Sequence, residues 1–322
     1  MRISRKKLIS EATQTGFRPE MLEKVLQLTV LLRALRAHPF LKDRIVLKGG
    51  TALNLFVFDL PRLSVDIDLN YVGAADRETM LAERPQLEQA INAVCDREGF
   101  AVRRIPGEHA GGKWHLRYES ELTAGGNLQL DLNFIFRVPL WPVTLQTSCA
   151  IGSYAPVEFP ILDKHELAAG KLAALMARHA SRDLFDAHQL LMGHQFDRDR
   201  LRIAFVVYGA LNRKDWRAVS ADDISFEARE LREQLLPLLR TDFLDGTEDT
   251  ARWAARLVEE SRESLNVVLP FTDREKTFLD RLLDGGEIDP SLLTDDDELQ
   301  RRIAAHPGLL WKAQNVRQFR KS

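Results

Sequence analysis

The sequence predicts an α+β fold in which a small mixed-sheet domain follows a short helical segment and precedes a helical C-terminal half. Strand-like segments gather between about residues 40 and 160, and long helical patterns dominate from about Leu162 onward. Strands and helices alternate only early in the chain, so a mixed sheet is expected rather than a doubly wound one. We therefore expect a helical lead-in at 1–40, an α/β domain at 41–160 and a helical domain at 161–322.

Composition is that of a globular protein. The 322 residues are 45% hydrophobic and 29% charged. A chain of this length can bury roughly three-quarters of its surface without disulfides. The two isolated cysteines, Cys95 and Cys149, favour a reducing compartment. There is no signal-peptide pattern, and no apolar run reaches the roughly 18 residues of a membrane span. We expect a cytoplasmic protein.

Charge is unevenly distributed although the net charge is only −2. Residues 1–48 contain 11 Lys or Arg and 4 Asp or Glu, and the remainder contains 34 and 43. A basic N-terminal surface could meet nucleic-acid phosphates, or it could be an ordinary solvated helix face. The sequence leaves both readings open.

The N-terminal elements follow from the spacing of apolar residues. Residues 19–38 form a helical pattern that begins at Pro19, a residue suited to a first turn. The short apolar run 44–47 predicts a buried strand ending at Gly49-Gly50. A helix then starts at Thr51 and stops near Pro61. Residues 64–72 alternate apolar and polar side chains, which predicts a strand with one polar face.

The next elements are a helix at 77–98, closed by Gly99, and three strands at 100–104, 113–120 and 127–136. A turn at 125–127 is expected between the last two strands. The helical patterns of the C-terminal half are interrupted by turn-forming residues, namely Gly193, Asn212, Pro270, Gly285-Gly286 and Pro307.

Two carboxylates stand out on the strand at 64–72. Asp66 and Asp68 are two residues apart, so their side chains share one face and repel each other unless a cation bridges them. Mg²⁺, or Mn²⁺, is the natural bridge because it takes hard oxygen ligands and holds phosphates. Asp131 lies on the polar face of the last strand. If the two strands are neighbours, three carboxylates could hold two metal ions. The alternative is a polar strand face turned to water.

The turn Lys48-Gly49-Gly50-Thr51 is the matching candidate for phosphate binding. Glycines allow close backbone approach, and amides at the start of a helix point toward an anion. The Walker spacing is absent, so this is not a P-loop.

A second charged cluster lies between residues 164 and 190. Lys171 and Arg178 are about two helical turns apart and could neutralise triphosphate charge, together with Arg182. Asp186 could orient Lys171 or bind the sugar or base. Asp183 belongs to the same charged cluster. The alternative is a set of surface ion pairs, which is common for helix charges.

The order of glycine turn, helix, Asp-x-Asp strand and later Asp resembles the nucleotidyltransferase superfamily of the polymerase-β type, with Thr51 at the position of the usual Ser. Beyond this superfamily pattern, the chain also resembles the AbiEii/AbiGii toxin family. It is carried by residues 47–53, 62–69, 171, 182–186, 278–282, 306–307 and 311–316.

This resemblance implies a toxin of a toxin–antitoxin or phage abortive-infection system, with an antitoxin encoded alongside. It also implies transfer of a nucleotide from an NTP to the tRNA acceptor end. By motif position, Asp66 and Asp68 would bind metal, Lys171 would contact the phosphates, and Asp186 would be the essential acid. Asp131 would be the base or a third ligand, and Ser64 would sit at the mouth of the site, where a phosphate could switch the enzyme off.

Parts of the sequence are compatible with three other functions. The acceptor could be a protein or a small molecule, and the sequence does not name it. A HAD-like phosphatase is disfavoured because Leu69-Asn70 follow the Asp-x-Asp pair and a glycine turn precedes it. A non-catalytic nucleotide- or RNA-binding module is disfavoured by the joint presence of all four motif residues, Asp66, Asp68, Lys171 and Asp186.

Overall fold

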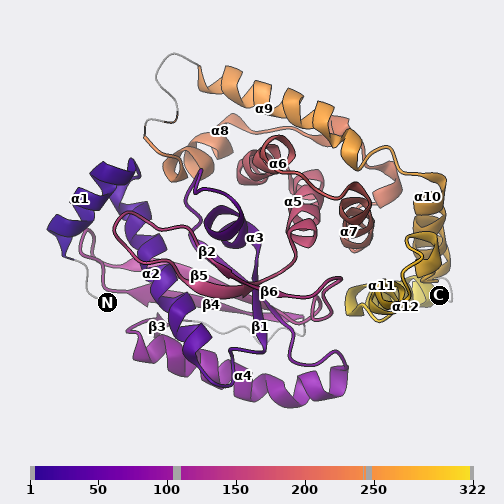
Figure 1. Ribbon diagram of the computed structural model, residues 1–322, viewed down its shortest axis with the longest axis horizontal. Helices are drawn as coiled ribbons and strands as arrows, with labels where there is room; N and C mark the ends of the chain where they lie inside the picture. The colour runs from indigo at the N-terminus through magenta and orange to yellow at the C-terminus, as the bar shows by residue number, and fades with distance from the viewer. Residues whose placement is uncertain (1–3, 104–109, 242, 244–248, 320–322) are drawn as a thin grey trace. The chain divides into compact units, whose positions relative to one another are not determined.

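The computed structural model describes residues 4–103, 110–241, 243 and 249–319 (Figure 1). The chain divides into two compact units. The first comprises residues 1–137, 143–162 and 236–245, and the second comprises 138–142, 163–235 and 246–322. The first unit holds a seven-stranded sheet with its helices, and the second is helical. The predicted α+β class, with a mixed sheet and helical segments on either side in sequence, is confirmed.

The sheet has the strand order β3-β4-β5-β2-β1-β7-β6. The parallel pairs are β2 with β5 and β1 with β7, and all other neighbours are antiparallel. The strands are β1 Ile45–Lys48, β2 Asp66–Tyr71, β3 Ala101–Val102, β4 Gly111–Tyr118, β5 Gly126–Asn133, β6 Thr144–Thr147 and β7 Glu158–Ile161. The predicted neighbourhood of the Asp66 strand and the Asp131 strand is thus confirmed.

One face of the sheet is apolar. Ile67, Leu69, Leu130 and Leu132 are buried on it. The helix α2 packs against β5, β7 and α4 (Figure 1). The helices of this unit are α1 Arg5–Thr15, α2 Pro19–Ala37, α3 Gly49–Ala52 and α4 Arg77–Arg97. The opposite face of β2, β4 and β5 therefore carries the polar side chains of the alternating strands.

Three local predictions differ from the structure. The turn predicted at 125–127 instead occupies residues 119–125, because Gly126 already pairs with Tyr118 and so belongs to β5, as does Asn127. Glycine is required at position 126, since a Cβ there would lie 2.0 Å from the tyrosine ring. The strand predicted at 100–104 is shorter in the structure, where β3 comprises Ala101–Val102. Arg104 lies outside the described residues. The strands β6 and β7 were not predicted. All four residues of β6 are exposed, so that strand shows no alternation of buried and exposed side chains. The residues of β7 do alternate in burial, but Pro160 within the strand disfavours a strand prediction.

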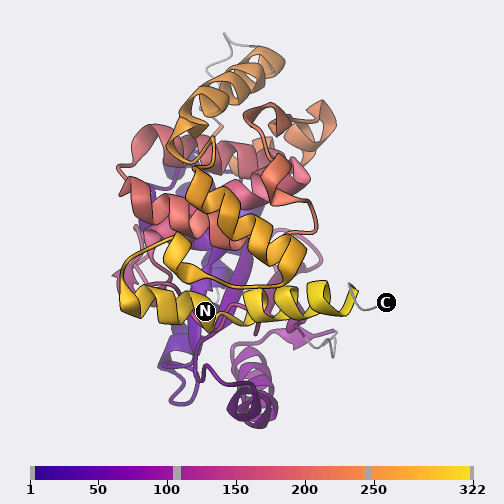
Figure 2. The ribbon, with the colours of Figure 1, turned by 90° about the vertical axis from the view of Figure 1, so that its right-hand side faces the viewer.

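The second unit is built from helices, as predicted. These are α5 Lys164–Arg178, α6 Ser181–Gly193, α7 Arg198–Ala210, α8 Ala228–Glu230, α9 Thr250–Ser264, α10 Asp273–Asp280, α11 Asp297–Ala304 and α12 Pro307–Phe319. Figure 2 shows α11 and α12 in yellow, one following the other. The predicted interruptions fall at or between helix ends, with Gly286 in the left-handed conformation and Pro307 opening α12.

Short 3₁₀ and π turns connect these elements in both units. They are Leu53–Val57, Trp216–Ala218, Ala221–Asp223, Leu231–Leu235, Leu236–Leu238, Leu265–Val267, Arg281–Gly285 and Pro290–Leu292. Among the residues that the structure describes, none of the helices has the length and apolar character needed to cross a membrane.

Candidate active site

A row of four charged residues crosses the polar face of the sheet. Lys48 of β1 lies opposite Asp68 of β2, Asp68 opposite Asp131 of β5, and Asp131 opposite Lys113 of β4. Directly opposed residues on neighbouring strands share a face and lie within side-chain reach. The sheet register therefore places two carboxylates side by side, with one lysine on each flank.

A second row runs parallel to the first, two residues along each strand. Asp66 lies opposite Gln129, and Gln129 lies opposite His115. Because strand side chains alternate between faces, these residues share the face of Asp68 and Asp131. The two rows together collect all three predicted carboxylates on one surface of the first unit.

Asp131 is partly buried, as are Asp66 and Asp68. Its Oδ2 lies 3.4 Å from the Lys113 Nζ and accepts a 3.1 Å hydrogen bond from the Gln129 Nε2. Its Oδ1 is buried and has no hydrogen-bond partner in the described part of the chain. Burial raises the pKa of the Asp131 carboxyl, the Lys113 ammonium lowers it, and the neighbouring Asp68 carboxylate raises it again.

Gly49 determines how closely the glycine turn approaches Asp68. Its φ of +71° lies in the left-handed region, and a Cβ at this position would lie 2.4 Å from the Asp68 Oδ2. Glycine is needed here both for the backbone conformation and for space. The turn that begins α3 is therefore held directly against the carboxylate.

The hydroxyls of Thr51 and Ser64 fasten this turn to the start of β2. Both residues are buried. The Thr51 hydroxyl donates to the Asp66 carbonyl oxygen, and the Thr51 and Ser64 hydroxyl oxygens lie 3.0 Å apart. In this structure, the two hydroxyls are used in joining α3 to β2.

A pocket of about 450 Å³ opens beside the first row. It is lined by Lys48, Asp68, Ala110, Gly111, Gly112, Lys113, His115, Asp131 and Asn133, with Leu69 and Leu132. Asp66 does not line it. The sequence-based candidates missed Lys113 and His115, because only the register of β4 against β5 brings these two residues to Asp131 and Gln129.

The chemistry of the donor groups fits a hard divalent cation. Asp66, Asp68 and Asp131 offer carboxylate oxygens on one face, and the buried Oδ1 of Asp131 lacks a hydrogen-bond partner among the described residues. Within the described ranges, no three His, Cys, Asp or Glu residues are yet grouped closely enough to hold a metal ion. Asp131 is engaged instead by Lys113 and Gln129.

The second predicted cluster lies wholly within the helical unit, and three of its members, Lys171, Asp183 and Asp186, are buried. The Lys171 Nζ lies 2.7 Å from the Asp183 Oδ1 and 2.9 Å from the Asp186 Oδ2. The Arg178 guanidinium also binds Asp183, through Nε at 2.6 Å and Nη2 at 3.1 Å. Burial raises the pKa of Asp183, but Lys171 and Arg178 outweigh burial and hold that pKa below its usual range.

These ion pairs are not a solvated helix face. Lys171, Asp183 and Asp186 are 8%, 1% and 0% exposed. The Arg178 side chain remains 65% exposed although its guanidinium is bound, and Arg182 is partly exposed. The ion pair between Asp186 and Lys171 is compatible with an orienting role, one of the two roles that the sequence predicts for Asp186.

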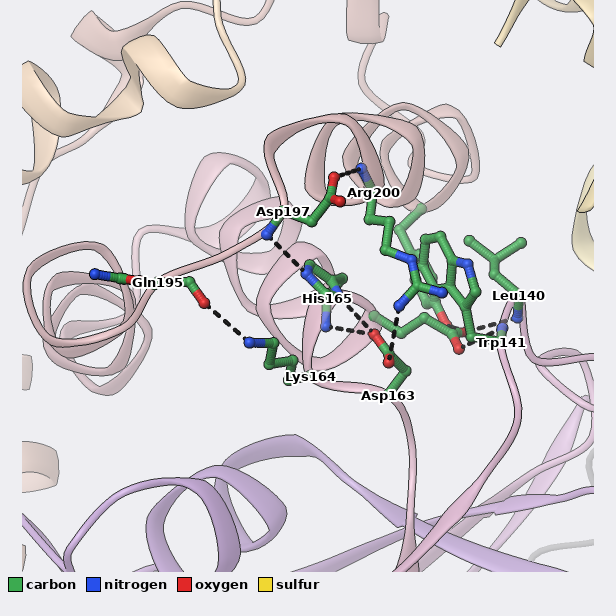
Figure 3. A network of polar contacts seen from close by, with 10 residues as sticks. Leu140, Trp141, Asp163, Lys164, His165, Gln195, Asp197 and Arg200 are labelled. Atoms are coloured by element: carbon green, nitrogen blue, oxygen red, sulfur yellow. Dashed lines mark hydrogen bonds and ion pairs between the residues drawn. The ribbon is translucent and has the colours of Figure 1, made fainter. Parts of the chain in front are cut away.

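A further network at the start of α5 involves residues to which the sequence assigned no role (Figure 3). His165 accepts a hydrogen bond from the Asp197 amide at Nε2, so its Nδ1 donates to the Asp163 Oδ1 2.7 Å away. The buried Glu166 next to it accepts from the amides of Leu140 and Trp141. This network ties the segment 138–142 to the helical unit.

Comparison with known families identifies the group to which these features belong. A family model described as "Nucleotidyl transferase AbiEii toxin, Type IV TA system" matches residues 30–267, which is well over half of the chain. The chain belongs to the AbiEii nucleotidyltransferase toxin family. The matched range includes the glycine turn, all three strand carboxylates and the Lys171 cluster.

A solved structure with the same fold is that of MenT4, a nucleotidyltransferase toxin from Mycobacterium tuberculosis H37Rv. The two chains share 16% sequence identity with a TM-score of 0.60, over 96% of this chain and 99% of that one. No curated protein matches the chain. The likeness to MenT4 extends the agreement in fold across almost the whole AbiEii chain.

Proposed function

We propose that this AbiEii family member is the toxin of a toxin–antitoxin pair and transfers a nucleotide from an NTP to the 3′ end of an RNA, with the tRNA acceptor end as its target. The observation that carries the proposal is the alignment of Asp68 with Asp131 beside the Gly49 turn, with Asp66 on the same face. Carboxylates on one face next to a close backbone turn suit a nucleotide bound with its cation.

Asp66, Asp68 and Asp131 are the residues that would hold Mg²⁺ or Mn²⁺. When bound, such an ion neutralises phosphate charge and makes the attacking hydroxyl a better nucleophile. A second role proposed for Asp131 is that of the base that accepts the proton of the RNA 3′-hydroxyl.

The phosphates of the NTP would meet the backbone amides at Gly49 and Gly50 and the ammonium of Lys48. Lys48 lines the pocket and lies opposite Asp68, so it can lie close to the triphosphate. In the helical unit, the ion pair with Asp186 holds Lys171 in place, and Arg178 and Arg182 add positive charge. We propose that this second cluster contributes to nucleotide binding, as the family motif implies.

The RNA would be held by basic residues outside the pocket. Arg5, Lys6 and Lys7 are exposed on α1, and residues 1–48 carry the largest excess of positive charge in the chain. This contact would be independent of base sequence and sensitive to salt. Besides the RNA, we propose one protein partner, the antitoxin.

The test uses the full chain with Mg²⁺, total tRNA and each α-³²P-labelled NTP in turn. Asp66→Ala is the inactive variant, and Asp43→Ala is the matched control because Asp43 is an exposed acid in the same unit. We expect RNA labelling from one or a few NTPs, lost only in Asp66→Ala. Label on a protein or small acceptor would replace RNA as the target, and no labelling of any acceptor would contradict the proposal.

A further inference from the structure

The Lys113–Asp131 ion pair places a positive charge where the proposed site needs a metal ion. The Lys113 Nζ lies 3.4 Å from the Asp131 Oδ2, and the two side chains are 45% and 33% exposed. The same oxygen also accepts from Gln129. One side of this carboxylate is therefore already occupied by donors from the protein itself.

The second oxygen of the Asp131 carboxylate, Oδ1, has different surroundings from Oδ2. This oxygen is buried and lacks a hydrogen-bond partner among the described residues, and Asp68 lies directly opposite Asp131 on the neighbouring strand. Asp131 thus stands between an ammonium and a second carboxylate. A buried oxygen without a partner is unfavourable, and a bound cation would relieve it.

Lys48 provides a useful contrast within the same row. It lies opposite Asp68, as Lys113 lies opposite Asp131, and both lysines line the pocket. No ion pair joins Lys48 to Asp68 in the parts of the chain that the structure describes. The Lys113 contact is therefore specific to one carboxylate and is not a general consequence of the row.

We propose that Lys113 is a built-in counter-ion of Asp131, which it holds in the metal-free protein and releases when a divalent cation and a nucleotide bind. The inference rests on the proposed function, because it requires Asp131 to become a ligand. Lysine suits this role because its charge sits on a flexible four-carbon chain that can move without the backbone.

Release of Lys113 would link the two binding events. The freed ammonium still lines the pocket, where the NTP phosphates are its natural partners. Metal alone must displace Lys113 without compensation, whereas metal with nucleotide offers the lysine a new partner. Metal and nucleotide should therefore strengthen each other's binding by the same factor.

The experiment measures Mn²⁺ binding to the full chain without nucleotide, by calorimetry and by the electron paramagnetic resonance signal of free Mn²⁺. The variants are Lys113→Met, which removes the charge, and Lys113→Arg, which keeps it. The matched control is Arg117→Met, because Arg117 is exposed on β4 and shares the face of Lys113. Unfolding midpoints establish that each variant is folded, with Lys113→Gln as the replacement if the methionine variant is not.

We expect Lys113→Met to bind Mn²⁺ about fivefold more tightly than the wild type, since the ion pair that competes with the metal for Asp131 is lost. Lys113→Arg and Arg117→Met should stay within about twofold of the wild type. A non-hydrolysable NTP analogue should tighten Mn²⁺ binding in the wild type, and by a smaller factor in Lys113→Met.

A double-mutant cycle tests whether Lys113 acts through Asp131. In an Asp131→Asn background, Lys113→Met should no longer change Mn²⁺ affinity, and a retained effect would overturn the inference. Unchanged affinity in Lys113→Met, with Mn²⁺ binding still lost in Asp68→Asn, would overturn it too but leave the proposed function standing. Absence of Mn²⁺ binding in every variant, with or without the nucleotide analogue, would overturn both.

Discussion

The two charged clusters of this AbiEii protein differ in how completely their charges are paired. In the sheet, the Asp131 Oδ2 is bound by Lys113 and Gln129, whereas the Oδ1 has no hydrogen-bond partner among the described residues. The ion pair with Lys113 is partly exposed. In the helical unit, Lys171 is buried between two aspartates, one of which also binds Arg178. The incompletely paired cluster can exchange its partners for ligands. The saturated one is expected to be rigid, so that it supports the fold and holds Lys171 and Arg178 in fixed positions for the nucleotide.

The largest expected effect is on activity and concerns the sheet cluster. Asp68→Asn should reduce nucleotide transfer by at least about a hundredfold, because a charged group at the reacting phosphate is lost. Its unfolding free energy should not fall, since one of two repelling carboxylates is removed. Urea unfolding and RNA labelling on the same preparation would check this. A matched loss of stability would place Asp68 among the structural residues.

The largest effect on stability should come from the helical cluster. Lys171→Ala leaves Asp183 and Asp186 buried without their shared cation, and we expect it to lower the unfolding free energy by about 3 to 5 kcal/mol. Urea unfolding provides the measurement. A variant as stable as the wild type would show that the cluster is not a structural network, and the comparison between the two regions would fail.

The glycine turn provides a test of intermediate size. Gly49→Ala forces an alanine into the left-handed region and brings its Cβ against Asp68, so we expect a loss of about 1 to 3 kcal/mol with reduced transfer. Gly170→Ala is the control, because in the described part of the chain a Cβ there meets no atom within 4 Å outside its own helix backbone and chain neighbours. Alanine also favours α5 by about 0.5 to 1 kcal/mol. Equal effects at the two positions would contradict this role of Gly49.

The smallest expected effects are on the pH dependence of the unfolding free energy, and they should have opposite signs in the two clusters. The lowered pKa of Asp183 contributes stability above its unfolded pKa of roughly 4, and this is lost as the pH falls through the folded pKa. The raised pKa of Asp131 has the opposite effect. Its contribution to stability is present below the unfolded pKa of roughly 4 and is lost as the pH rises through the folded pKa.

Urea unfolding between pH 3 and pH 7 separates these contributions. The stability deficit of Asp183→Asn relative to the wild type should shrink as the pH falls below about 4. Asp131→Asn should gain stability relative to the wild type as the pH rises above the same value. Parallel pH profiles for the two variants would remove the electrostatic distinction between the clusters.

The sequence predicts those parts of the fold in which a periodic pattern coincides with burial. The alternation at Ile67 and Leu69 identified β2, and the helical spacing after Pro19 identified α2. The exposed β6 carries no such pattern, because its place in the sheet depends on pairing with β7 and not on a buried face. Long-range pairing of this kind leaves no local signal.

The same distinction applies to the candidate site. Asp66 and Asp68 could be recognised because both lie on one strand, and Asp131 because its strand has a polar face. Lys113 could not, since its relation to Asp131 arises from the register of two strands. Likewise, the sequence placed Lys171 and Asp183 in one charged cluster but could not show that they are in contact or that both are buried, because contact and burial are set by tertiary packing.

The central claim, transfer of a nucleotide, is tested most directly by comparing two labels of the same NTP. Wild-type protein, tRNA and Mg²⁺ are incubated with the NTP labelled either at the α- or at the γ-phosphate, with Asp66→Ala as control. We expect α-label on the RNA and γ-label only in pyrophosphate, both requiring Asp66. Transfer of the γ-label to the RNA, or α-labelling that persists in Asp66→Ala, would contradict the claim.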